Sequence, residues 1–266
     1  MTINHRFTSV LQSLQIEVTT RCNLNCSYCA GRFYQNQRDM SLEQFQGILD
    51  THVAKYGRPS RVIIQGEGEP TLNAELFAMA EYCKRQKFFT SLTTNGLHSD
   101  RDSLIKHFDE IFVSIDTINP EEANKLGRLN IQKVLEAVEY YRSKKKQVFI
   151  QAVQMPDINQ DKALQAWARA KGIKLIVLPL SSKQEYIKVY KGKLSMPFSE
   201  LHQNFNCRHV KDPERYFYTI DGTLLPCCYI KDTTAYPGMD AMLKAIKTNT
   251  CPQVCQGCRF ANLTNK

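Results

Sequence analysis

The sequence lacks the long apolar run that would mark a membrane-spanning helix. No stretch of about 18 consecutive apolar residues occurs in its 266 residues. The opening segment, M-T-I-N-H-R-F-T-S-V, also lacks the apolar core of a secretory signal peptide. We therefore expect a cytoplasmic chain with no membrane partner.

Acidic residues are comparatively few, with 26 Asp and Glu against 35 Lys and Arg, so the formal net charge is +9. A basic surface attracts anionic partners such as nucleic acid, an acidic peptide or an anionic cofactor. Lysines gather at 144–146 and again at 183–193, where Tyr186 and Tyr190 stand among them. A solvated face also explains such groups. Since no RNA-binding motif accompanies them, nucleic acid is not the expected partner.

Cysteine, by contrast, is abundant, with ten residues. In a chain without a secretion signal, this number favours metal binding or catalysis over a disulfide framework. Three of the ten, Cys22, Cys26 and Cys29, lie in the segment T-R-C-N-L-N-C-S-Y-C-A-G. Three thiolates on one loop can hold three irons of a cubane cluster and leave the fourth iron open.

A structural zinc site and disulfides are the other interpretations of this triplet. Structural zinc usually takes four ligands, and no fourth ligand is evident nearby, because His5 and His52 lie well away in the sequence. Cytosolic reducing conditions disfavour disulfides. The triplet alone leaves all three chemistries open.

Six segments with the pattern of strands alternate with helical segments. The expected strands are 14–18, 61–65, 88–94, 110–116, 147–153 and 173–178. The expected helices are 41–56, 73–87, 100–107, 131–143 and 160–170. This alternation predicts an α/β fold with a parallel sheet and right-handed crossovers. Function in such folds gathers at the carboxyl ends of the strands, and the cysteine triplet directly follows the first strand.

A glycine-rich turn, Q-G-E-G-E-P, follows the second expected strand. Gly66 and Gly68 let the backbone approach a ligand closely, and Glu69 can offer a carboxylate to an ammonium group. The alternative is an ordinary turn with a solvated carboxylate.

Polar residues also follow the third and fourth expected strands. Ser91, Thr94 and Asn95 belong to the third, and Ser114 and Asp116 end the fourth. Because strand side chains alternate, Ser114 and Asp116 point to one side, where hydroxyl and carboxylate suit a ribose diol. Strand-end residues that simply meet water are the alternative.

Together these motifs resemble the radical S-adenosylmethionine (SAM) superfamily. Tyr28, before the last cysteine, fits its pattern, and Gly68–Pro70 is similar to its Gly-Gly-Glu-Pro motif, from which the interposed Glu67 departs. The resemblance implies a partial (β/α)6 TIM-type barrel and a [4Fe-4S] cluster on Cys22, Cys26 and Cys29 that binds SAM. The residues it places at SAM are Tyr28, Gly66, Gly68, Glu69, Ser91, Thr94, Asn95, Ser114 and Asp116.

The last sixty residues hold the other large group of cysteines: Cys207, Cys227, Cys228, Cys251, Cys255 and Cys258. They resemble the twitch and SPASM extensions of radical SAM enzymes, which hold auxiliary iron–sulfur clusters. The shorter twitch form implies one auxiliary [4Fe-4S] cluster, for which we expect four thiolates, with Cys251 as a competitor for one place: Cys207, Cys227, Cys255 and Cys258. Cys228 is then spare or functional, and with Asp116 it is a candidate catalytic residue, while zinc stays open as an alternative for the tail.

This interpretation divides the chain into a barrel (1–180), a linker (181–206) and a cluster-bearing extension (207–266). The resemblance implies reductive cleavage of SAM to a 5′-deoxyadenosyl radical, which abstracts a hydrogen atom from the substrate. Our first expectation is maturation of a ribosomally made peptide by crosslinking, epimerisation or backbone excision. It would involve a separate leader-recognition protein and an external electron donor of the flavodoxin or ferredoxin type. The alternatives are a twitch-type dehydrogenase of a small molecule such as an aminoglycoside, an RNA-modifying enzyme and a non-enzymatic zinc module.

Overall fold

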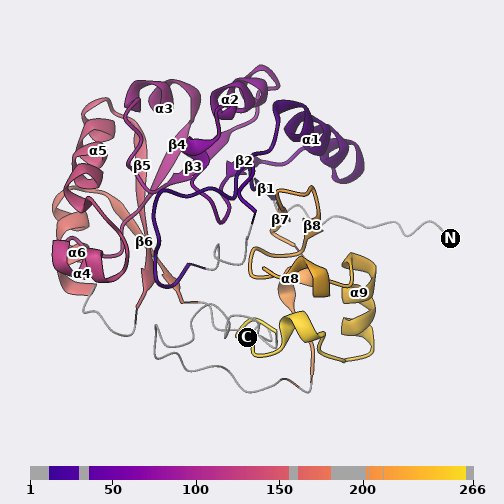
Figure 1. Cartoon of the computed structure of the whole chain (residues 1–266). Coiled ribbons are helices and arrows are strands. Elements are labelled where there is room, and N and C mark those ends of the chain that lie inside the picture. The colour runs from indigo at the N-terminus through magenta and orange to yellow at the C-terminus, as the bar shows by residue number, and fades with distance from the viewer. Residues whose placement is uncertain are drawn as a thin grey trace.

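An eight-stranded sheet runs through the part of the chain that the structure describes (Figure 1). The computed structural model describes residues 12–29, 36–155, 161–180, 202, 204–211 and 213–261. The strands are β1 (Ser13–Ile16), β2 (Arg61–Ile64), β3 (Thr90–Thr94), β4 (Glu110–Ser114), β5 (Gln147–Gln154), β6 (Lys174–Pro179), β7 (Arg215–Tyr218) and β8 (Leu224–Leu225). Their spatial order is β6-β5-β4-β3-β2-β1-β7-β8. Strands β1 to β7 pair in parallel, and β8 pairs with β7 in antiparallel.

Helices follow the strands in sequence, and those of the barrel cover the outer face of the sheet (Figure 1). They are α1 (Leu42–Tyr56), α2 (Leu76–Arg85), α3 (Arg101–His107), α4 (Pro120–Lys125), α5 (Ile131–Ser143), α6 (Asp161–Ala170), α8 (Arg208–Lys211) and α9 (Met239–Lys247). The predicted α/β partial barrel with a cysteine-rich C-terminus is thus confirmed. None of the described helices combines the length and apolar character needed to span a bilayer.

The start of α1 shows how local sequence sets an element. The Ser41 side chain accepts a hydrogen bond from the Gln44 N–H, and the Gln44 side chain accepts one from the Ser41 N–H, which closes a capping box. Phe45, Leu49 and His52 then fall on one buried face. The helix ends before Gly57, whose φ of 87° suits glycine.

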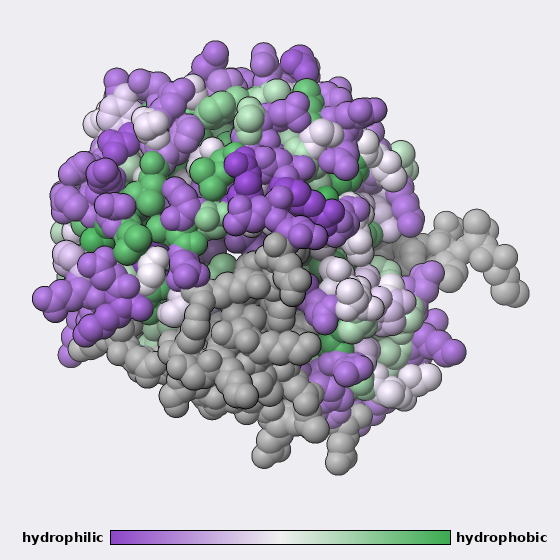
Figure 2. Space-filling model, viewed as in Figure 1, coloured by the Kyte–Doolittle hydropathy of each residue, from purple (hydrophilic) through white to green (hydrophobic). Residues whose placement is uncertain are grey.

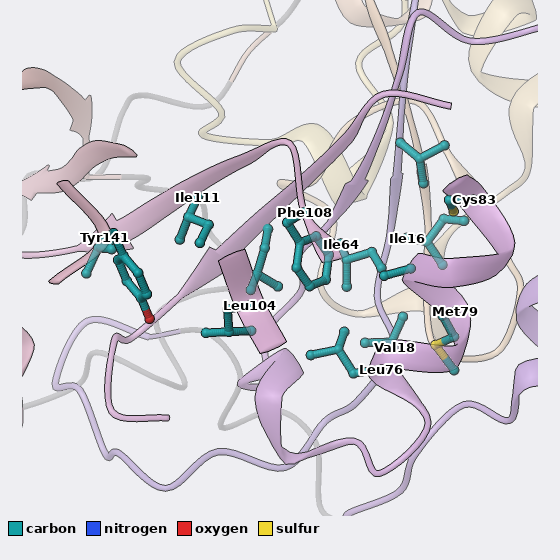
Figure 3. Packing of buried hydrophobic residues seen from close by; sticks show 14 of the residues in the cluster. Ile16, Val18, Ile64, Leu76, Met79, Cys83, Leu104, Phe108, Ile111 and Tyr141 are labelled. Carbon is teal, nitrogen blue, oxygen red and sulfur yellow. The ribbon is translucent and has the colours of Figure 1, made fainter. Parts of the chain in front are cut away.

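The main hydrophobic core lies between the sheet and these outer helices. Ile16 and Ile64 come from strands, while Leu76, Met79 and Cys83 come from α2, and all are at most 1% exposed (Figure 3). Since strand side chains alternate, Gln15 points to the opposite face of β1 from Leu14 and Ile16. The apolar sequence pattern therefore leaves the inner face of the sheet for polar chemistry.

The C-terminal region joins the sheet instead of standing apart from it. Strand β7 pairs with β1 from Ser13↔Arg215 to Ile16↔Tyr218. The rest of this region, including α9, packs around a second core that contains Phe205, Val254 and the tail cysteines. Helix α9 is not among the helices expected from the sequence. The predicted linker, 181–206, and its lysine–tyrosine group fall largely outside the described residues.

Candidate active site

A cavity of about 410 Å³ lies on the inner face of the sheet. Its walls come from the segment 19–29 that carries Cys22, Cys26 and Cys29 (the cysteine loop) and from the Gln65–Glu69 turn. Inward-facing residues of β2 to β7 and the tail segment Cys228–Lys231 complete them. Most of the predicted site residues line it: Cys22, Cys26, Tyr28, Cys29, Gly66, Gly68, Glu69, Thr94, Asn95, Ser114 and Cys228. The topology thus brings together motifs that are separated by as many as two hundred residues.

The cysteine loop is braced by the segment after α4. The Ser27 N–H donates to the Leu126 carbonyl oxygen at 2.9 Å. Gly127 has a φ of 77°, and a Cβ there would lie 2.3 Å from the Asn25 carbonyl oxygen. Neither α4 nor this contact was predicted from the sequence, in which Gly127 is the local feature that could have indicated a close approach.

Asp116 lies behind the cavity wall and holds two residues that form it. One carboxylate oxygen accepts the Val153 N–H at 2.8 Å, and the other accepts Arg128 Nε at 2.8 Å and the Tyr28 hydroxyl. Arg128 also donates to the Tyr28 oxygen. Burial raises the pKa of Tyr28 well above its ordinary value, and the charge of Asp116 adds to this. Asp116 therefore positions Tyr28 and Arg128, while only the latter two face the cavity.

The turn after β2 packs backbone to backbone against the cysteine loop. A Cβ on Gly68 would lie 2.3 Å from the Thr19 carbonyl oxygen and 2.7 Å from that of Arg21. The Glu69 N–H donates to the Arg21 carbonyl oxygen at 2.7 Å. Only glycine fits at this approach.

The Glu69 carboxylate is buried and held by four donors. Thr71 donates from both its N–H and its hydroxyl, the Thr94 hydroxyl donates at 2.7 Å, and the Asn95 N–H donates at 2.6 Å. Burial raises the pKa of Glu69, and these donors partly offset the rise. Their placement fixes the carboxylate at the cavity wall, where it can receive an ammonium group.

Ser91 does not line the cavity, in contrast to Thr93 on the same face of β3. It is fully buried, and its hydroxyl donates to Glu110. Side chains at positions 91 and 93 share a face of β3, but Glu110 occupies the space in front of Ser91.

Two charged residues at the site, buried Glu17 and partly buried Lys231, were not expected from the sequence. Glu17 accepts the Glu67 N–H at 2.7 Å and the Ile220 N–H at 3.2 Å, so it ties the glycine turn to the tail. Lys231 pairs with Glu67, the residue that interrupts the glycine motif. Burial lowers the pKa of Lys231 to about 8. An isolated Glu in a strand and an isolated Lys in a loop carry no sequence signal for such contacts.

All six tail cysteines belong to the second core. Cys207, Cys255 and Cys258 are buried, and the other three are partly buried against them. Cys228 faces the main cavity. The Tyr236 hydroxyl is a buried donor with no hydrogen-bond partner among the described residues. Burial raises the pKa of Tyr236, and so do the nearby Cys227 and Cys255.

The cysteine thiols of the loop and of the tail are soft donors of the kind that bind iron–sulfur clusters and zinc. Within the described ranges, no three His, Cys, Asp or Glu side chains converge closely enough to hold one metal ion. Partial burial raises the pKa of the Cys22 thiol, and the hydrogen bond from the Leu24 N–H opposes the rise.

Comparison with known proteins identifies the class. The radical SAM superfamily model matches residues 16–166, more than half of the chain, so the protein belongs to the radical SAM superfamily. The predicted family is thereby confirmed. Membership implies a [4Fe-4S] cluster and SAM, and the cysteine loop beside the Glu69 carboxylate has the residues to hold them.

Among curated relatives, the chain is 27% identical to a GTP 3′,8-cyclase of Bradyrhizobium diazoefficiens, over 65% of this chain and 53% of that protein. It is 30% identical to an S-adenosylmethionine-dependent nucleotide dehydratase of Selenomonas ruminantium, over 44% of this chain and 43% of that protein. The chain thus spans about half the length of these relatives. Among solved structures, Streptococcus suis SuiB bound to its precursor peptide SuiA matches with a TM-score of 0.65 and 18% identity, over 94% of this chain and 67% of that one.

Proposed function

We propose that this protein is a radical SAM enzyme that modifies a ribosomally made peptide and carries one auxiliary [4Fe-4S] cluster in its tail. When bound, the cluster and SAM supply one-electron chemistry that removes a hydrogen atom from a carbon of the substrate. The chain's own residues hold these groups, orient the substrate and limit access of water.

Each part of the cavity has a role in this proposal. Cys22, Cys26 and Cys29 hold the cluster, and Glu69 receives the amino group of SAM. Thr94 and Asn95 keep Glu69 in place through their hydrogen bonds to its carboxylate. Preorganised contacts of this kind place the reacting carbon at the cofactor.

The observation that carries the peptide proposal is the extent of the match to SuiB. That structural match covers 94% of this chain, tail included, with a TM-score of 0.65. The partner in that structure is a precursor peptide. A separate leader-recognition protein and a flavodoxin- or ferredoxin-type electron donor belong to the same proposal.

The auxiliary cluster is supported by the tail's chemistry. Four thiols, on Cys207, Cys227, Cys255 and Cys258, share one core. The Tyr236 hydroxyl beside Cys227 and Cys255 lacks an acceptor among the described residues, and cluster sulfur is such an acceptor.

Anaerobic reconstitution tests whether the barrel and the tail each hold a cluster. We expect about eight irons per chain, and about four if only the barrel holds a cubane. The peptide proposal is tested by incubating the loaded enzyme with a short precursor peptide encoded beside its gene. A mass or deuterium change in the peptide that depends on SAM supports the proposal, and an unchanged peptide with SAM still consumed contradicts it.

A nucleotide is the second candidate substrate. The observation in its favour is that two curated relatives bear names of nucleotide enzymes, at 27% and 30% identity. SAM-dependent conversion of GTP or another nucleoside triphosphate by the same preparation would favour it over the peptide.

A further inference from the structure

Four basic side chains line the cavity: Arg61, Arg128, Arg215 and Lys231. Three of them pair with carboxylates: Arg61 with Glu110, Arg128 with Asp116, and Lys231 with Glu67. Arg215 differs, because among the described residues its guanidinium donates only to neutral oxygens. These are Ser13 Oγ at 3.4 Å and Gln15 Oε1 at 3.3 Å. Arg215 therefore brings to the cavity a positive charge that no described carboxylate balances.

The sheet register places Arg61 and Arg215 on either side of one residue. Ser13 on β1 pairs with Arg61 on β2 and also with Arg215 on β7. Neighbouring strands lie about 4.8 Å apart, so the Cα atoms of the two arginines are roughly 10 Å apart on the same face of the sheet. Both side chains line the cavity. Two guanidinium groups arranged in this way can close on one anionic group.

This pair lies at the opposite end of the cavity from the cysteine loop. Arg61 begins β2, and the glycine turn begins at Gly66, five positions further along the chain. At about 3.3 Å a residue, the separation is roughly 16 Å along the strand direction. SAM at the cysteine loop cannot place its carboxylate there. The charge is therefore available to a second molecule in the same cavity.

We propose that Arg215, together with Arg61, anchors an anionic group of the substrate, a carboxylate or a phosphate, at the end of the cavity remote from the cluster. This inference rests on the proposed function, because it assumes that the cavity binds the substrate. A carboxylate would come from an acidic side chain of a peptide, and a phosphate from a nucleotide. Anchoring there would hold an extended substrate with its other end at the cysteine loop.

The test uses the reconstituted full-length protein and two probes, inorganic triphosphate and an acetylated triglutamate peptide amide, in isothermal titration at low salt. The variants are Arg215→Gln and, as the charge-conserving variant, Arg215→Lys. The control is Arg101→Gln. Arg101 is the first residue of α3 and is not among the residues that line the cavity. SAM binding is measured on each variant to verify the fold, since Arg215 is remote from the cysteine loop.

We expect at least one probe to bind the wild type and the control alike, with the affinity falling as salt rises. Arg215→Gln should weaken it about ten- to a hundred-fold, as expected for a lost charged hydrogen bond, and Arg215→Lys should weaken it less. Binding of triphosphate alone assigns a phosphate, and binding of the peptide alone a carboxylate. The inference is overturned if neither probe binds, or if Arg215→Gln binds as tightly as the control. Failure of the wild type to form 5′-deoxyadenosine from SAM would contradict the proposed function instead, because the titrations involve no turnover.

Discussion

Replacing Gly68 by alanine should separate the glycine turn from the cysteine loop. The new Cβ would lie 2.3 Å from the Thr19 carbonyl oxygen, more than about 1 Å inside ordinary contact, and both partners are backbone. Separating them also breaks the 2.7 Å hydrogen bond from the Glu69 N–H to the Arg21 carbonyl oxygen. Overpacking of this kind and one lost hydrogen bond together cost about 3 kcal/mol.

Urea unfolding of the cluster-free protein and SAM binding by the reconstituted protein measure the two consequences. We expect Gly68→Ala to lose about 3 kcal/mol of stability and to bind SAM more weakly, because Glu69 moves with the turn. The matched control is Gly47→Ala in the interior of α1, where an added Cβ meets nothing within 4 Å. It should gain about 0.5–1 kcal/mol. A Gly68→Ala protein with wild-type stability and SAM affinity would refute the steric reasoning.

Three further substitutions probe other contacts. Burial lowers the pKa of His52 from 6.5 to about 4. Between these pH values the imidazole is protonated in the unfolded chain but neutral in the folded one. About 3 kcal/mol of stability, fully present above pH 6.5, is therefore lost as the pH falls toward 4. In urea unfolding of the cluster-free protein, His52→Leu should make the free energy of unfolding depend less on pH in this range. An unchanged pH dependence would contradict the role of His52. Tyr28→Phe removes the hydroxyl that bonds to Asp116 and Arg128, and should lower the free energy of unfolding by about 1–3 kcal/mol in the same assay. An unchanged free energy of unfolding would show that this contact does not stabilise the fold. Tyr236→Phe should leave the cluster-free protein as stable as before but lower the reduction potential of a tail cluster by removing a donor, and an unchanged potential would remove Tyr236 from that site.

The strands and main helices could be predicted because their signals are local. The run R-V-I-I-Q becomes β2, and the Ser41 cap and apolar spacing define α1. The cysteine triplet and the glycine turn could be placed at one edge of the sheet because both follow parallel strands. Their packing follows from that edge, since Gly68 touches the carbonyl oxygens of the cysteine loop.

What could not be predicted depends on contacts between distant residues. Glu17 looks like the polar member of an alternating strand, and only the fold brings it to Glu67 and Ile220. The sequence predicts Asp116 at the cofactor, whereas in the fold one of its carboxylate oxygens accepts hydrogen bonds from Arg128 and Tyr28. The pairing of β7 with β1 joins positions about two hundred residues apart, and no local pattern encodes it. On the face shown in Figure 2, the described surface carries many hydrophilic residues, with hydrophobic patches among them.

The central claim is that Cys22, Cys26 and Cys29 hold a cluster that cleaves SAM. It is tested most directly by measuring 5′-deoxyadenosine formed from SAM by the anaerobically reconstituted, reduced protein, beside the Cys26→Ala variant. We expect the wild type to form 5′-deoxyadenosine and the variant, with its remaining cysteines intact, to form none. A variant as active as the wild type, or an iron-loaded wild type that leaves SAM intact, would contradict the account.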